Sequence, residues 1–168
     1  IPKGVREHYD GLSLGFDPIQ KFPIPDFKPI ANTEYFIKES SIAQTPYMAF
    51  EWQGPDTRTD SAATIAADVF STILNLNSSK WHQALINKGL ATSAILNYLT
   101  EKYVGPISIN ILPNSEKLND CYKEIMNQIS LWNSNDYFTE EQLNNAKQII
   151  KRNRIRQEER PSSLTGQL

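Results

Sequence analysis

The chain has 168 residues, the usual size of one domain, and its 39% hydrophobic share is compatible with a globular core. Its formal net charge of −2 provides no overall attraction to nucleic acid or to an anionic membrane. The single cysteine excludes an intramolecular disulfide, and no apolar run approaches the ~20 residues of a membrane span.

Residues 1–30 contain five of the ten prolines. Proline fixes φ and removes a backbone donor, so we expect neither a helix nor a central strand here. One interpretation is an extended arm laid over the domain and anchored by Phe22, Ile24 and Phe27. An interdomain linker is the other, and in either case the domain itself is expected to cover residues 31–168.

The regular part begins with two β-prone segments, residues 33–38 and 46–53. The second alternates in polarity, with one face formed by Met48, Phe50 and Trp52. Residues 58–75 then change to helical spacing, with an apolar stripe of Ala62, Ala66, Val69 and Ile73.

A short helix is predicted over residues 80–87, capped by the preceding serines and ended near Gly89. Two strands follow, 90–100 and 105–112, and the short connection between them predicts a hairpin. One face of the second strand carries Ile107, Ile109 and Ile111.

The last third is predicted to be helical. A first helix, capped by Asn114 or Ser115, has an apolar stripe of Leu118, Tyr122, Ile125, Ile129 and Trp132. Thr139 and Gln142 have capping-box spacing and open a second helix that continues to about residue 160. The fold class is therefore α+β, with a mostly antiparallel sheet and helices packed on one face.

The sequence offers no self-sufficient zinc chemistry. It has two distant histidines, His8 and His82, and no H-x-x-E-H or H-E-x-x-H run, whereas a zinc site needs three or four converging ligands. Ordinary surface or capping histidines are the favoured interpretation, so no metal site is predicted. Cys121 lies on or beside the helical apolar stripe, and a buried small hydrophobe is favoured over a nucleophile. We therefore predict no catalytic residue in this chain.

A local excess of positive charge lies in the last helix, at Lys147, Lys151, Arg152, Arg154, Arg156 and Arg160. Acidic residues at the start of that helix and basic residues near its end suit the helix dipole, so a solvated surface is the favoured interpretation. Nucleic-acid binding through this helix remains an alternative, although no nucleic-acid partner is predicted.

The run Trp52-Gln53-Gly54-Pro55 places a large aromatic residue at the end of a strand, just before a forced turn. Core packing followed by a chain reversal explains this run without any function.

Several runs nevertheless follow one another in a familiar order. They are Asp17-Pro18 with Pro23-x-Pro25, Pro46-x5-Trp52-x-Gly54-Pro55 with Asp60 and Ala62-Ala63, Ser79-Lys80-Trp81-x3-Leu85 with Lys88-Gly89-Leu90-Ala91, and Tyr137-Phe138-Thr139-Glu140-Glu141-Gln142-Leu143-x2-Ala146-Lys147. In this order, over about residues 17–168, they resemble the insulinase, pitrilysin and mitochondrial-processing-peptidase family of zinc metallopeptidases, the inverzincins.

The resemblance implies a substrate-chamber domain of a zinc metalloendopeptidase that degrades or processes peptides. Such enzymes close two halves of homologous α+β domains around a peptide, and the zinc and the glutamate base belong to the first domain. This chain resembles the second, non-zinc-binding domain of a half, apparently truncated at both ends. A companion zinc-bearing domain, in the same protein or in a partner subunit, and a peptide substrate are the partners implied. The substrate-chamber candidates are Trp52, Gln53, Gly54, Pro55, Lys88 and Gly89.

One departure from the family pattern concerns an arginine and a tyrosine that often flank the Gly-Leu step in non-catalytic halves. Ile86 and Thr92 hold the corresponding places, so that substrate-contacting role is not expected here. The resemblance leaves two alternatives, the second domain of a catalytic half or a structural, partner-binding domain of an inactive relative. Because the arm is similar to that of bacterial members, a periplasmic or otherwise exported location is also suggested.

Overall fold

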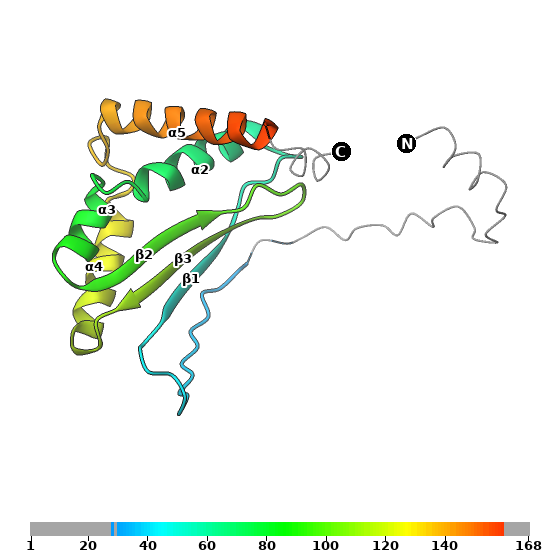
Figure 1. Ribbon diagram of the computed structural model, residues 1–168. Helices are drawn as coiled ribbons and strands as arrows, with labels where there is room; N and C mark the ends of the chain where they lie inside the picture. Colours follow the sequence, from blue (N-terminus) through cyan, green and yellow to red (C-terminus); the bar gives the residue numbers. More distant parts are fainter. Residues whose placement is uncertain (1–27, 29, 160–168) are drawn as a thin grey trace, which may run out of the picture.

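The computed structural model describes residue 28 and residues 30–159 (Figure 1). Its main elements are β1 (Met48–Gly54), α2 (Ser61–Leu74), α3 (Lys80–His82), β2 (Ala91–Tyr98), β3 (Gly105–Pro113), α4 (Leu118–Leu131) and α5 (Glu140–Glu158). A π-helical turn, Gln83–Asn87, extends α3, and a 3-10 turn, Ser115–Lys117, precedes α4. None of the described helices combines the length and apolarity needed to cross a bilayer.

The three strands form one antiparallel sheet in the order β1-β3-β2. Its central row consists of Phe50, Ile109 and Leu96, which lie opposite one another on the side facing the helices. Ile109 and Leu96 are buried there, whereas Glu51 and Asn97, one position further along, are exposed on the other side. The predicted α+β fold, with helices against one face of the sheet, is confirmed.

The outer edge of β2 is closed by side chains rather than by another strand. The Asn75 side chain, at the end of α2, donates to the Leu96 carbonyl at 2.7 Å and accepts from the Leu96 N–H at 3.1 Å. The Trp81 indole N–H donates to the Ala94 carbonyl at 3.1 Å. These bonds satisfy backbone groups that an edge strand otherwise leaves open to another chain.

The helix ends follow the local sequence. The Thr139 hydroxyl accepts from the Gln142 N–H and the Gln142 side chain accepts from the Thr139 N–H, so the predicted capping box is confirmed. The Ser79 hydroxyl accepts from the His82 N–H at the start of α3. Gly89 has φ +66°, a left-handed conformation that favours glycine after a helix, as predicted.

The predicted strand over residues 33–38 is wrong. These residues have no strand pairing, and Tyr35, Phe36 and Ile37 are 79%, 85% and 97% exposed. The predicted arm over residues 1–30 lies outside the described residues, apart from Lys28 and Ile30.

Two predicted apolar stripes are only partly buried. In α2, Ala62 and Ala66 are exposed, and the buried residues are Thr64 in the first turn and Ile73 and Leu74 at the end of the helix. In α4 the buried side turns away from Leu118 and Tyr122, which are 39% and 40% exposed, and the fully covered residues are Cys121 and Ile125. The prediction was wrong here because α4 offers apolar side chains on more than one side, and packing chooses between them.

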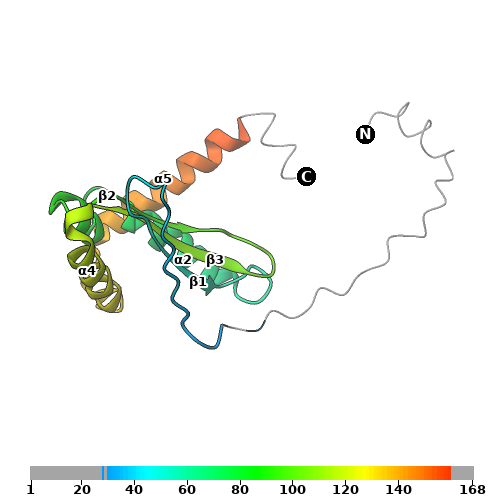
Figure 2. The same ribbon diagram turned by 90° about the horizontal axis from the view of Figure 1, so that it is seen from below.

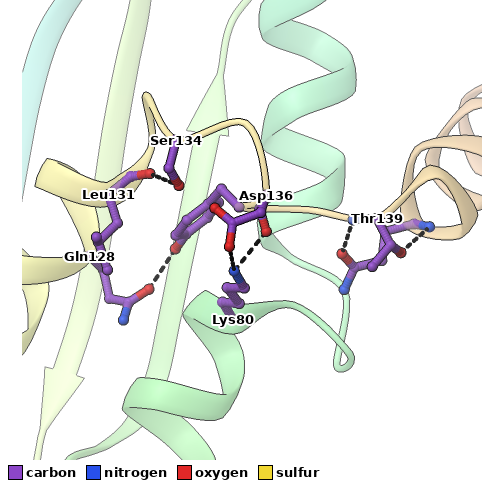
Figure 3. A network of polar contacts seen from close by, with 8 residues as sticks. Lys80, Gln128, Leu131, Ser134, Asp136 and Thr139 are labelled. Carbon is purple, nitrogen blue, oxygen red and sulfur yellow. Dashed lines mark hydrogen bonds and ion pairs between the residues drawn. The ribbon is translucent and has the colours of Figure 1, made fainter.

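Polar bonds fix the connection between α4 and α5 (Figure 3). The Lys80 ammonium, at the start of α3, donates to the Asp136 carbonyl at 2.6 Å. The Tyr137 hydroxyl donates to the Gln128 side-chain carbonyl at 2.6 Å, and both residues are buried. Burial raises the pKa of Tyr137 to about 12. Lys80 thereby holds a residue 56 positions later in the chain, next to Tyr137 in the hydrophobic core.

Replacing the buried phenol tests this connection. Tyr137→Phe removes the donor to Gln128, and we expect the free energy of unfolding to fall by about 1–2 kcal/mol in urea denaturation at pH 7. Tyr35→Phe, at an exposed position, should leave it unchanged.

The same tyrosine predicts a pH dependence. Because the folded-state pKa of Tyr137 is raised from 10.0 to about 12, its neutral phenol favours the folded state below pH 10. That stability should be lost as the pH rises from about 10 to 12, and Tyr137→Phe should lose less over the same interval. Equal losses in the two proteins would contradict the assignment.

Candidate functional site

Trp52 and Gln53 are neighbours in β1 but face opposite sides of the sheet. Trp52 lies opposite Ile107 on the helix side, where its side chain remains 38% exposed. Gln53 lies opposite Pro106 on the other face, which is covered by none of the helices in the described part of the chain. The two candidates therefore belong to different surfaces.

Gly54 and Pro55 form a tightly packed corner with the start of β3. A Cβ atom at Gly54 would lie 2.6 Å from the Gly105 carbonyl oxygen, and one at Gly105 would lie 1.9 Å from the Pro55 carbonyl oxygen. The Tyr98 hydroxyl donates to that Pro55 carbonyl at 2.7 Å. Close backbone approach thus accounts for this part of the Trp-Gln-Gly-Pro run.

The chain after the corner makes a side-chain-capped turn into α2. Asp56 Oδ1 accepts from the backbone N–H groups of Thr59 at 2.8 Å and Arg58 at 2.9 Å. The bond from Thr59 is the main cause that holds the pKa of Asp56 below its ordinary value, because it favours the ionised carboxylate. Asp60 then caps α2 by accepting from the Ala63 N–H at 2.8 Å. Both carboxylates therefore accept hydrogen bonds from backbone N–H groups and have a structural role in this turn.

Lys88 and Gly89 lie at the opposite end of the sheet, before the start of β2. The Gly89 carbonyl accepts from the Asn114 side chain at 2.6 Å and from the Lys117 ammonium at 3.3 Å. Lys88 is paired with Glu124 at 3.9 Å. Gly54 pairs with the first residue of β3 and Ala91 with the last, and nine residues of strand span about 26 Å. The six candidates therefore form two separate groups.

The described residues provide neither a metal-ligand group nor an activated thiol. No three histidine, cysteine, aspartate or glutamate side chains among them lie together as a metal site requires. Cys121 is fully buried, and burial raises the pKa of its thiol, which keeps it protonated at neutral pH. His8 lies outside the described residues, and His82 is part of α3.

The basic residues of α5 lie on a helix that projects beyond the sheet (Figure 2). Every residue from Lys151 to Gln157 is exposed. This arrangement is typical of a solvated helix surface, and it leaves cations accessible to an anionic partner.

One surface feature was missed by sequence reasoning. Phe50 stacks on Trp52 at 6.2 Å between ring centroids, and on Tyr122 of α4 at the same distance. We call these three residues the aromatic strip. It continues on α4 into Leu118 and Met126, which are partly exposed and one helical turn to either side of Tyr122. The alternation in β1 indicated half of this surface, but no local signal linked Phe50 to a residue 72 positions later.

Comparison with known proteins agrees with this architecture. A solved protease from Helicobacter pylori has a similar fold, with a TM-score of 0.65 and 16% sequence identity over 99% of this chain. The chain spans 41% of that structure's length. No curated protein matches the sequence.

The molecule is thus an α+β domain whose described part has no metal-binding group of its own. Residues 8–150 match the model of the peptidase M16 inactive domain, so the chain belongs to the peptidase M16 family, as its inactive, non-zinc-binding domain.

Substitution at the glycine corner tests whether it is structural. Gly105→Ala places a Cβ against the Pro55 carbonyl, and we expect the free energy of unfolding to fall by about 3 kcal/mol through overpacking. Gly89→Ala meets no atom nearer than 3.8 Å and should cost only the left-handed backbone strain, about 1–2 kcal/mol. Urea denaturation followed by tryptophan fluorescence measures both, and a smaller loss for Gly105→Ala than for Gly89→Ala would contradict the close packing.

Proposed function

We propose that this chain forms a wall of the substrate chamber in a zinc metalloendopeptidase that degrades or processes peptides. The observation that carries the proposal is the match of residues 8–150 to the inactive domain of a peptidase family. The protease from Helicobacter pylori, with its similar fold, supports it.

The chemistry in this proposal is divided between domains. Zinc bound elsewhere in the protein would activate a water molecule for attack on the peptide carbonyl. The described residues do not fit that metal, because His82 and the buried Cys121 are not joined by further ligands. This chain would instead shape the chamber and pack against the zinc-bearing companion, in the same protein or in a partner subunit.

Of the six chamber candidates, Gln53 lies best for contact with a peptide. It is half-buried on the sheet face that none of the described helices covers, where Glu51 and Asn97 are exposed. Trp52 belongs to the aromatic strip on the other side. Gly54, Pro55 and Gly89 would contribute backbone shape, and Lys88 an exposed ammonium already paired with Glu124.

The division of labour predicts a difference between the isolated chain and the full-length protein that contains it. With a quenched fluorogenic peptide, the full-length protein should hydrolyse the substrate, lose activity to 1,10-phenanthroline and regain it with zinc. The 168-residue chain with added zinc should show none. Activity in the isolated chain would overturn the proposal. An inactive full-length protein would favour the structural, partner-binding alternative.

A wall residue should affect substrate binding more than chemistry. In the full-length protein we expect Gln53→Ala to raise KM roughly two- to tenfold with little change in kcat, as expected when a uniform binding contact is lost. Gln148→Ala, at an exposed site on α5, is the matched control and should change neither constant. A pure loss of kcat in Gln53→Ala would contradict a wall role.

The basic helix favours one further possibility, binding of nucleic acid, since Lys151, Arg152 and Arg156 are exposed. Salt-dependent retention of the chain on immobilised DNA would support it, and passage without retention at low salt would remove it.

A further inference from the structure

The hydrogen-bond pattern shows which backbone groups β1 presents at its outer edge. Since Asn75 bonds both backbone groups of Leu96 from outside, Leu96 does not bond its opposite residue, Ile109. In an antiparallel sheet, hydrogen-bonded and non-hydrogen-bonded pairs alternate along two strands. The backbone groups of Ile109 therefore point away from Leu96 and bond Phe50 of β1 on the other side. The backbone groups of Ala49, Glu51 and Gln53 consequently point away from the sheet. No backbone hydrogen bond from the described residues reaches this edge outside the sheet itself.

Both faces of the sheet beside this edge carry side chains that could contact an added strand. On the helix side lies the aromatic strip, with Trp52 and Tyr122 partly exposed at its two ends. On the open side Glu51 is exposed and forms no ion pair within the described part of the chain. An added strand would therefore meet large apolar side chains at alternate positions and one carboxylate between them.

We propose that the outer edge of β1 binds an extended peptide as a fourth strand of the sheet. The main-chain groups of Ala49, Glu51 and Gln53 supply the hydrogen bonds, and alternate side chains of the peptide supply specificity. The preferred peptide has two large apolar residues that flank a basic residue, because the apolar pair faces Phe50 and Trp52 while the basic residue faces Glu51. That this peptide is a substrate of the peptidase rests on the chamber function proposed above.

Two other occupants compete for the edge. The extended residues 33–38 of the same chain run on the β1 side of the sheet without pairing to it (Figure 1). A second copy of the chain could also pair its own β1 there. Either occupant would cover the edge before any peptide is added, whereas the proposal requires the edge to be open in the free chain.

Hydrogen exchange of individual amides, followed by NMR on the 168-residue chain, tests the proposal. The probe is a seven-residue synthetic peptide with alternating leucine and threonine and a central arginine. In the free chain the amides of Phe50 and Trp52 should be protected, and those of Ala49, Glu51 and Gln53 should exchange rapidly. Peptide at saturation should slow exchange at these three amides at least about tenfold, and N-methylation of the peptide's central arginine should abolish the effect because it removes a main-chain donor.

A charge exchange tests the assigned register. Glu51→Lys should raise the Kd of the arginine peptide about two- to fivefold and lower that of a glutamate version by a similar factor. Glu101→Lys, exposed outside the sheet, is the matched control and should change neither.

Unchanged exchange at the three amides in saturating peptide would overturn the proposal. So would protection of these amides in the free chain, whether independent of concentration, as residues 33–38 would give, or dependent on it, as a second copy would give. Peptide binding by the isolated chain together with an inactive full-length protein would overturn the proposed enzyme function and leave the strand site standing.

Discussion

The pair of hydrogen bonds between the Asn75 side chain and the Leu96 backbone determines the asymmetry of this domain. An amide side chain substitutes for a neighbouring strand, and the Trp81 indole continues the same substitution at Ala94. These bonds attach α2 and α3 to the edge of β2. The middle of the β2 edge is thereby occupied, whereas no such bond within the described residues occupies the outer edge of β1, beside which the aromatic strip lies.

Features set by a few neighbouring residues were predictable from the sequence. The capping box at Thr139, the serine cap of α3 and the left-handed Gly89 each depend on interactions within about one helical turn. The hairpin of β2 and β3 followed from alternation and a short connection. The strand predicted over residues 33–38 failed because β propensity states only that a segment fits a sheet, and no hydrogen-bonded partner strand is supplied to it.

The candidate site shows a different limit of sequence reasoning. A run of four letters, Trp52 to Pro55, indicated one surface, yet it combines a ring on the helix side, an amide on the open side and a corner required by backbone packing. Lys88 and Gly89 came from a second run at the far end of the sheet. A motif can identify the type of domain, but it does not say which of its residues pack and which are available at the surface. The strand register makes that distinction. The aromatic strip depends on a contact between β1 and α4 that no periodicity encodes.

The last feature with wider consequences is the shape of α5. Its first half is packed against the domain, with Ala146 completely buried, while each residue from Lys151 to Gln157 is exposed. Helicity beyond the packed half depends on propagation from a stable nucleus, which costs far less than starting a new helix. A partner bound to residues 151–157 would therefore be held in a fixed orientation relative to the sheet, because the same helix continues without a break to the buried Ala146.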